Sequence, residues 1–340
     1  MDAQVNNHLA AYTGQRVLVT GAAGFLGANL IDLLKDVDCR IIRLMKTEAA
    51  LTSLQSRAEI KDVIGDIREA GIWRRVLGGV DVVFHFAAQT SVLVADENPE
   101  ADFEVNVSPM LRLLETCRLN GWRPIIIFSG TVTEGGIPTR LPVDDTPPDK
   151  PIAIYDLHKL IAENYLGYYA DQKFVAGATL RLANVYGPGP RSSSADRGVL
   201  NLMIRKALRG EELSVYGKGD NLRDYVYAPD VARAFLMAAA HIERVNGQHF
   251  VIGSGVGHTL LEAFNLVADR VAAQTGRRVP VRLVEPPRPL SPIETRNFVA
   301  DSSRFTQATG WRASYQLSAG IDRTIEAYQQ QETAVSETAG

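Results

Sequence analysis

A glycine-rich turn near the start of the chain constrains the fold more than any other feature of the sequence. The residues Thr20-Gly-Ala-Ala-Gly-Phe-Leu-Gly27 follow an apolar run, Arg16–Thr20, and open a stretch with apolar residues at helical spacing, Phe25–Lys35. The three glycines allow a tight turn, close approach of the backbone to a ligand and close packing of helix on strand. The start of such a helix favours a pyrophosphate because its amides are open and partly positive. A strand before the turn and a helix after it predict a dinucleotide-binding unit.

Short apolar runs alternate with longer amphipathic stretches along much of the chain. Runs without polar alternation, separated by helices, are typical of a parallel sheet that is covered on both faces. The order indicates an α/β protein with a doubly wound parallel sheet. The predicted strands are 16–20, 39–44, 61–65, 81–86, 124–128, 178–182 and 250–252, and the predicted helices include 25–35, 155–169, 201–209 and 229–244.

Prolines and polar residues mark the irregular places. Pro109 interrupts a helical stretch, so we expect a kink there or a new helix with Ser108 as its cap. The segment Pro286–Pro292 is too rich in proline for a helix or a central strand and is predicted to be loop. The polar tail, residues 329–340, is expected to fray.

Composition excludes several classes of protein. The 36 Lys and Arg against 39 Asp and Glu give a net charge of -3, so no overall field favours nucleic acid or an anionic membrane. No apolar run is long enough to span a bilayer, and the N-terminus lacks the pattern of a secretory signal. Cys39, Cys117 and six scattered histidines form neither a disulfide framework nor a metal motif. We expect a cytoplasmic protein with no metal and with neither nucleic acid nor membrane as partner.

A second chemical signal is the sequence Tyr155-Asp-Leu-His-Lys159. Residues four apart lie on one face of a helix, where a lysine ammonium lowers the pKa of a phenol and makes it a proton donor or acceptor near neutral pH. Such pairs also occur by chance on solvated helix surfaces. The pattern gains weight because a predicted strand leads into Phe128-Ser-Gly-Thr131 upstream, and the carboxyl ends of parallel strands line the ligand crevice.

With these residues in view, the chain resembles the extended short-chain dehydrogenase/reductase family, which contains nucleotide-sugar epimerases, dehydratases and reductases. The resemblance covers about residues 15–325. It rests on motifs that follow the family's order, namely Gly21 to Gly27, Gly65-Asp66-Ile67, His85-Phe-Ala-Ala-Gln89, Asn106, Thr131, Tyr155 with Lys159, Arg181 to Pro188, and Arg223 to Asp230.

The resemblance implies a division into two domains. Residues 1–184 with about 226–255 would form a Rossmann-like dinucleotide-binding domain. Residues from about 185–225 and 256–328 would form a smaller α/β domain for the nucleotide sugar, and residues 329–340 a disordered tail. The family's habit also implies a homodimer through paired helices that include the Asn106 and Tyr155 segments.

The resemblance also assigns roles to residues. Tyr155 would move the proton of a sugar hydroxyl or carbonyl, Thr131 would bond the same oxygen, and Lys159 would hold the nicotinamide ribose and favour the phenolate. The implied cofactor contacts are Gly21, Gly24, Phe25, Leu26, Gly27, Arg43, Lys46, Asp66, Ile67, Ala87, Ala88, Asn106, Tyr155 and Lys159. The implied substrate contacts are Gln89, Ser91, Thr131, Asn184, Tyr216, Arg223 and Arg288.

Some of these assignments have an ordinary structural alternative. Asn184 and Arg223 resemble residues that hold the substrate diphosphate; without the resemblance each would be read as a cap or a surface charge, and with it the ligand role is favoured. Tyr216 either stacks near the base or packs in the core. Arg288 lies in an RPLS sequence where the family usually has RPGD, which leaves its role open, and His158 is expected to be structural.

The sequence departs from the family pattern in two places. Dehydratases of the family carry an Asp-Glu pair directly after the catalytic Thr, and decarboxylases a Glu two positions after it. This chain has Val132 and Thr133 there, with Glu134 one step later, so dehydration and decarboxylation are disfavoured. The second predicted strand ends without the acidic residue of an NAD site, whereas Arg43 or Lys46 could pair with a 2′-phosphate. We therefore expect NADP, with NAD as the alternative.

Three functions remain open from the sequence. The absence of an acid at the strand end favours a 4-ketoreductase that uses NADPH to reduce a nucleotide-bound 4-keto-hexose. The alternative is a nucleotide-sugar 4-epimerase that retains NAD and returns the hydride to the opposite face of the sugar. A non-catalytic dinucleotide sensor is a remote third reading, because Thr131, Tyr155 and Lys159 are all present.

Overall fold

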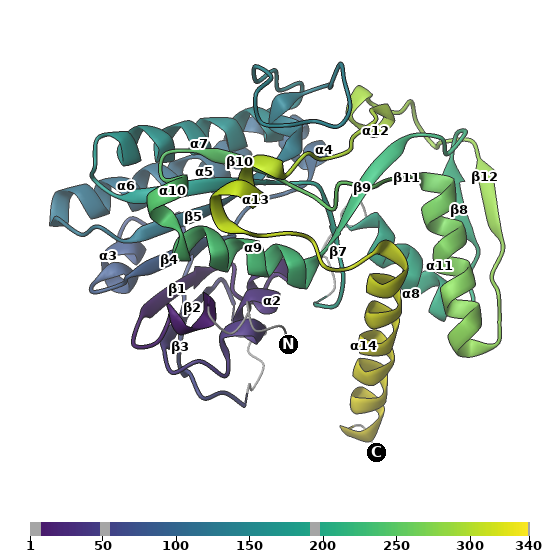
Figure 1. The fold of residues 1–340 in the computed structure, drawn as a ribbon, viewed down its shortest axis with the longest axis horizontal. Coiled ribbons are helices and arrows are strands. Elements are labelled where there is room, and N and C mark those ends of the chain that lie inside the picture. Colours follow the sequence, from purple (N-terminus) through teal and green to yellow (C-terminus); the bar gives the residue numbers. More distant parts are fainter. Residues whose placement is uncertain (1–7, 48–54, 191–197, 339–340) are drawn as a thin grey trace.

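A central sheet of seven parallel strands organises the fold (Figure 1). The structure is a computed structural model that describes residues 8–47, 55–190 and 198–338, with side chains of the last helix described to residue 331. The strand order is β10-β6-β5-β4-β1-β2-β3. The doubly wound α/β class predicted from the sequence is confirmed. The strands are β1 (Arg16–Thr20), β2 (Arg40–Met45), β3 (Glu59–Ile64), β4 (Val82–His85), β5 (Ile125–Thr131), β6 (Ala176–Leu182) and β10 (His249–Ile252).

Helices cover both faces of this sheet. In β1, Val17 and Val19 pack in one core cluster, which includes Phe235 of α9, and Leu18 packs in the other, which includes Leu113 of α6. Alternate residues of one strand are therefore buried on opposite faces, which is why these strands lack polar alternation. One face carries α2 (Phe25–Leu34) and α9 (Ala228–Ala240), and the other carries α3 (Ile72–Leu77), α6 (Ser108–Asn120) and α7 (Ile154–Asp171).

Shorter elements connect or extend these layers. A single 3-10 turn, η2 (Val132–Gly135), follows β5 directly. Helix α5 packs against α7, and α13 packs against β10. The remaining short helices of this part are α4 (Val92–Glu97), α5 (Pro99–Asn106), α10 (Ile242–Val245) and α13 (Ser303–Thr309).

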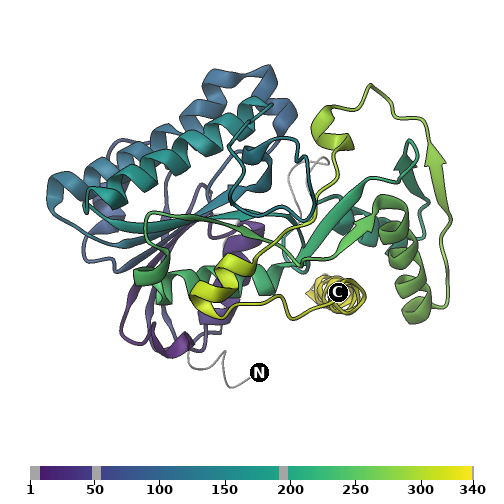
Figure 2. The ribbon, with the colours of Figure 1, turned by 45° about the horizontal axis from the view of Figure 1, so that its top comes forward.

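A second, smaller group of elements lies beside one end of the sheet (Figure 2). Its strands form a three-stranded sheet in the order β11-β9-β7 and a parallel pair of β12 with β8. Its helices α8, α11 and α14 share a core that includes Tyr186, Phe264 and Ile321. The elements are β7 (Asn184–Tyr186), β8 (Leu213–Tyr216), β9 (Leu222–Tyr227), β11 (Gly257–Thr259), β12 (Val281–Val284), α8 (Val199–Leu208), α11 (Leu260–Thr275), α12 (Pro292–Thr295) and α14 (Leu317–Thr338).

The structure departs from the sequence predictions at several element ends. A new helix does begin before Pro109, but its cap position is Val107, without a side-chain cap bond, and not Ser108. The predicted helix 229–244 breaks at His241 into α9 and α10. Helix α14 continues to Thr338, so most of the tail predicted to be disordered is helical. The chain after Gly320 contains no proline, and its Gln, Glu and Ala residues are good helix formers.

Candidate active site

The glycine-rich turn forms a cradle between β1 and α2. Gly21 has a φ of +62°, and a Cβ built on it would lie 2.8 Å from the backbone nitrogen of Ala87. A Cβ on Gly27 would lie 2.5 Å from the carbonyl oxygen of Gly21. Gly24 occupies the cap position of α2 and has no side chain with which to bond the open amides of the first turn, which include those of Phe25 and Leu26. These residues fit the pyrophosphate of a dinucleotide, because the atoms nearest the three glycines are backbone atoms and the helix dipole favours negative charge.

A buried threonine and histidine fix the neighbouring loop after β4. Thr20 Oγ1 accepts hydrogen bonds from the backbone N–H groups of Phe86 and Ala87, both at 3.1 Å. The same hydroxyl lies 2.9 Å from Nδ1 of His85. Burial, with the charge of Lys159 adding to it, lowers the pKa of His85 to about 3. The Thr20 hydroxyl therefore donates to a neutral imidazole, and this pairing holds Ala87 and Ala88 beside the glycine turn.

The end of β2 carries the two cations that the sequence proposes for a 2′-phosphate. The guanidinium of Arg43 is buried and donates to both carboxylate oxygens of Asp62 on the adjacent strand, at 2.6 and 2.8 Å. Lys46 is exposed, and its Nζ lies 3.6 Å from Asp66 Oδ2. Arg43 is thus held by the protein itself, which leaves Lys46 as the more accessible of the two.

Asp66 and Ile67 follow β3, as the family's adenine-contacting motif requires. The Asp66 carboxylate accepts bonds from the backbone N–H and the guanidinium of Arg68, at 2.6 to 3.0 Å. These hydrogen bonds lower the pKa of Asp66 to about 2, against a smaller opposing effect of burial. The carboxylate is therefore ionised, and the predicted adenine contact stays a prediction.

A polar cluster around Asp102 ties α5 to the loop after β4 and to α7. The amide of Asn106 donates to the Gln89 carbonyl at 3.0 Å and to Asp102 Oδ1 at 2.9 Å, and Gln89 Nε2 donates to the same carboxylate oxygen at 2.8 Å. His158 Nδ1 lies 2.7 Å from Asp102 Oδ2, which agrees with a structural role for this histidine. Ser91 is buried and caps α4. Gln89 and Ser91, predicted to contact substrate, thus have structural hydrogen bonds in this structure.

The three residues proposed for catalysis lie on β5 and α7, two elements that pack together. Thr131 is the last residue of β5, and Tyr155 lies in the first turn of α7 with Lys159 one turn later. Lys159 is buried, and its ammonium lies 3.9 Å from the centre of the Phe128 ring. Burial lowers the pKa of Lys159 to about 8, although nearby carboxylates oppose the shift. A cation buried at this place favours the phenolate form of a tyrosine on the same helix face.

A buried carboxyl group holds the backbone of Thr131. Glu134 is fully buried, and its Oε1 accepts a bond from the Thr131 N–H at 2.7 Å. Its Oε2 lies 3.0 Å from Nε of Arg181. Burial raises the pKa of Glu134 well above its ordinary value, and the charge of Glu163 raises it further. Glu134 is therefore turned away from the crevice, in agreement with the sequence argument against dehydration.

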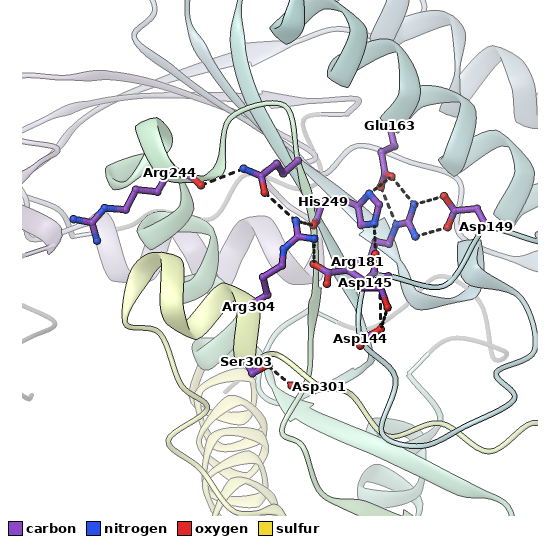
Figure 3. A network of polar contacts seen from close by, with 12 residues as sticks. Asp144, Asp145, Asp149, Glu163, Arg181, Arg244, His249, Asp301, Ser303 and Arg304 are labelled. Carbon is purple, nitrogen blue, oxygen red and sulfur yellow. Dashed lines mark hydrogen bonds and ion pairs between the residues drawn. The ribbon is translucent and has the colours of Figure 1, made fainter.

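Arg181 lies at the centre of a network of buried charged side chains that also includes Glu134; the part around Glu163 and Asp149 is shown in Figure 3. Its guanidinium donates to both carboxylate oxygens of Asp149, at 2.5 and 2.9 Å, and to both of Glu163, at 2.5 and 3.0 Å. His249 Nδ1 lies 3.1 Å from Glu163 Oε1. Burial opposes ionisation of Glu163, but the bonds from His249 and Arg181 prevail and lower its pKa to about 2. The network joins β6, β10 and α7 directly beneath the end of β5.

The residues proposed for the nucleotide-sugar end have different surroundings. Asn184 is exposed at the start of β7, and Tyr216 is exposed at the end of β8, which excludes a core position for this tyrosine. Arg223 is buried and donates to the carbonyl oxygens of Leu222, Glu294 and Arg296. Arg288 pairs with the Glu294 carboxylate at 2.9 and 3.1 Å. Both arginines are thus held within the protein, and their contacts with substrate stay predictions.

Sequence reasoning missed two buried charged residues at this site. Asp156 follows Tyr155 directly, is 0% exposed, and accepts a bond from the Thr133 hydroxyl. Arg296 is buried, and its Nε and Nη1 have no hydrogen-bond partner among the described residues. Burial lowers the pKa of Arg296 to about 10, the charge of Arg223 adds to the shift, and Asp156 opposes it. The sequence could have indicated Asp156, because this charged residue stands directly beside Tyr155 of the Tyr-Lys pair. Arg296 could not have been found in this way, because it comes near Asp156 only in the folded chain.

Two kinds of feature are absent from the described part of the chain. Within residues 8–47, 55–190 and 198–338, no group of three or more His, Cys, Asp or Glu side chains could hold a metal ion. In the same residues, no helix combines the length and the apolar character that crossing a membrane requires.

Comparison with known proteins identifies the family. Residues 17–253 match the NAD dependent epimerase/dehydratase family, so the chain belongs to that family and is an enzyme of this class. The resemblance to extended short-chain dehydrogenases/reductases drawn from the sequence motifs is thereby confirmed.

Individual relatives are similar along nearly the whole chain. The UDP-glucose 4-epimerase of Mycolicibacterium smegmatis is 31% identical over 92% of this chain and 97% of its own length. The CDP-paratose 2-epimerase of Salmonella typhi is 26% identical over 92% of this chain and 98% of its own. Among solved structures, the UDP-glucose 4-epimerase of Thermotoga maritima with UDP-glucose has a TM-score of 0.81 at 29% identity, covering 94% of this chain and 100% of that one. The Thermus thermophilus UDP-glucose 4-epimerase in complex with NAD has a TM-score of 0.77 at 29% identity, covering 93% and 99%.

Proposed function

We propose that this enzyme interconverts the two 4-epimers of a nucleotide-activated hexose with NAD that it retains. The observation that carries the proposal is that Thr131 ends β5 while Tyr155 and Lys159 lie in the first turns of α7, a helix that packs against that strand. The carboxyl group of Glu134 is buried beneath the end of β5, which argues against elimination of water. The proposal replaces the ketoreductase favoured by the sequence, because relatives that match nearly the whole chain include UDP-glucose 4-epimerases.

Thr131, Tyr155 and Lys159 support transfer of a proton together with a hydride. The nicotinamide, when bound, supplies the hydride acceptor and donor. Tyr155 takes the proton of the C4 hydroxyl as the hydride leaves, and returns it when the 4-keto group is reduced. Thr131 lies at the end of β5 to bond the same oxygen, and the buried Lys159 favours the tyrosine in its phenolate form.

For the substrate we propose a UDP-hexose. Relatives named for UDP-glucose support this nucleotide, and Asn184 and Tyr216 are exposed where the nucleotide end would lie. Arg296 is a better candidate than Arg288 for an anionic group of the substrate, because its Nε and Nη1 are unpaired among the described residues while Arg288 is paired with Glu294.

The choice of NAD over NADP has its own support. Solved relatives include the Thermus thermophilus UDP-glucose 4-epimerase in complex with NAD. The bidentate pairing of Arg43 with Asp62 weakens the sequence argument for a 2′-phosphate site, because of the two cations proposed for it Lys46 alone is exposed. The specific observation that still favours NADPH and ketoreduction is the end of β2, where Met45 and Lys46 stand in place of an acidic residue.

The experiment that separates these functions begins with the bound dinucleotide. The purified protein is denatured, the released dinucleotide is identified by mass, and the native protein is incubated with UDP-galactose without added cofactor. We expect stoichiometric NAD and conversion to UDP-glucose. A protein that releases no NAD, and that oxidises one NADPH for each 4-keto-sugar reduced, would instead establish the ketoreductase.

We also propose that the enzyme is a homodimer through α5 and α7, which pack side by side. Their outer surface exposes Phe103, Leu157 and Tyr168 to between 40% and 59%. Light scattering should give twice the chain mass of 37.1 kDa, and F103E with L157E should give the monomer because a charge cannot enter an apolar interface without large cost. L283E, on the exposed face of β12, is the matched control and should remain dimeric. A monomeric wild-type protein at micromolar concentration contradicts the proposal.

A further inference from the structure

The hydroxyl of Thr131 is connected to a buried carboxyl group by a second hydroxyl. Thr131 Oγ1 lies 2.9 Å from Thr133 Oγ1, and the Thr133 hydroxyl donates to Asp156 Oδ1. Asp156 is 0% exposed, and its Oδ2 has no hydrogen-bond partner among the described residues. The chain of bonds therefore runs from the end of β5 through η2 to the residue that follows Tyr155 on α7.

Counting protons along this chain gives it a direction. A hydroxyl has one proton to donate, and an ionised carboxylate only accepts. When Asp156 is ionised, Thr133 donates to it, so the oxygen of Thr133 is left to accept the proton of Thr131. When Asp156 carries a proton on Oδ1, it donates to Thr133, Thr133 donates to Thr131, and the proton of Thr131 is free for another acceptor.

We propose that Asp156, acting through Thr133, determines whether Thr131 donates a hydrogen bond to the reacting oxygen of the substrate. Asp156 is a positioning residue, since the structure places it against Thr133. The inference rests on the proposed function, in which Thr131 bonds the oxygen at C4. In both half-reactions this oxygen carries partial negative charge in the transition state, from loss of its proton in the oxidation and from the arriving hydride in the reduction, so a donor stabilises the transition state and an acceptor does not.

The groups that face Asp156 set its pKa within a range of pH in which kcat can be measured. Burial raises the pKa of Asp156 to about 6, while the bond from Thr133 and the charge of Arg296 oppose this and Asp96 of α4 adds to it. Of the neighbouring acids, Asp96 accepts a bond from the first N–H of α7 at 3.1 Å, and Glu134 of η2 is held by Arg181. Arg296 approaches from the segment after α12 and is the opposing cation.

The direction in which kcat changes with pH follows from the direction of these hydrogen bonds. As pH rises through the pKa of Asp156, the carboxyl ionises and draws the Thr131 proton away from the substrate oxygen. One donor to a developing oxyanion is worth roughly 10²- to 10³-fold in kcat, and part of that effect is lost when the donor is diverted. We expect kcat of the wild-type enzyme to fall by about 10- to 100-fold across this ionisation.

The test measures kcat against pH in four variants beside the wild type. T133V keeps the shape of the side chain and removes the link, and D156N removes the ionisation. Both should lose the fall in kcat with rising pH, and T133S should restore it. T146V is the matched control, because Thr146 donates a comparable bond to Asp144, at 2.6 Å, in an exposed loop. Its profile should equal that of the wild type.

The outcomes separate this inference from the function on which it rests. If the wild type turns over but T133V and D156N keep its pH profile, the role of Asp156 is refuted while the epimerase proposal stands. A wild type that turns over no nucleotide hexose removes both. If T133V does not unfold cooperatively on heating, the pH profile of D156N alone tests the inference. Loss of a merely structural hydrogen bond would lower stability without changing the shape of the profile of kcat against pH.

Discussion

Replacing Tyr155 by phenylalanine is expected to lower kcat by about 10²- to 10⁴-fold while the affinity for the dinucleotide stays close to that of the wild type. The substitution removes one oxygen, which is the atom that moves the proton, and leaves the packing of the ring at the start of α7. The glycine cradle and the first turn of α2 are separate elements, so binding of the pyrophosphate is unaffected. Steady-state kinetics and dinucleotide titration of the same preparations measure the two effects.

Two further variants make this result specific. Y168F removes a phenolic oxygen from the same helix at a site 59% exposed, and should leave kcat unchanged. K159A should lower both the rate and the dinucleotide affinity, because the resemblance assigns Lys159 to the nicotinamide ribose as well as to the phenolate. Near-normal turnover of Y155F would remove Tyr155 from its role, whatever the other variants show.

Sequence patterns were sufficient for the sheet because its strands are buried on both faces. The runs around Val17, Val83 and Ile126 contain no polar alternation, and each became a parallel strand of the central sheet. Where a boundary depends on packing, the patterns were less informative. The predicted helix breaks at His241, where no proline or glycine marks an end. The continuation of α14 to Thr338 instead agrees with a local signal, since that stretch has no proline and contains good helix formers.

The candidate site divides in the same way between local and distant information. Thr131 at the end of a strand, and Tyr155 with Lys159 four residues apart on a helix, could both be predicted from the sequence. The partners of the arginines could not be predicted from the sequence. Arg43 meets Asp62 only because β2 and β3 pair in a particular register, and Arg223 meets the carbonyl of Arg296 only because distant segments fold together. A basic residue in a motif therefore indicates a charge, while its availability to a ligand depends on tertiary pairing.

Replacing Arg181 by methionine is expected to lower the free energy of unfolding by about 3–5 kcal/mol, the cost of leaving a buried charge uncompensated. Its side chain is 4% exposed, and its guanidinium faces Glu163 and Asp149 (Figure 3). It also lies 3.0 Å from Glu134. Methionine fills much of the space of the aliphatic stem but donates no hydrogen bond. Urea unfolding followed by circular dichroism measures the loss.

Controls for this prediction use both an exposed pair and a compensating change. R118M breaks the pair with Glu115, which is between a third and two fifths exposed, and should cost less than about 1 kcal/mol because solvent screens the charges. Adding E163Q to R181M should recover part of the loss, since one of the stranded carboxylates is removed. A loss under about 1 kcal/mol for R181M would show that the three acids tolerate each other without the guanidinium.

The pH dependence of the R181M loss provides a further check. In the wild type the bonds from His249 and Arg181 lower the pKa of Glu163 to about 2 despite its burial, so the paired carboxylate contributes stability that is present above its unfolded value and is lost as pH falls towards 2. Without Arg181 the carboxyl group of Glu163 protonates at a higher pH. The cost of burying its unpaired charge disappears once the group is protonated. The difference between R181M and wild type should therefore be largest near neutral pH and shrink towards pH 4. Since Glu134 of this network holds the Thr131 N–H, kcat at neutral pH should fall with the loss of stability.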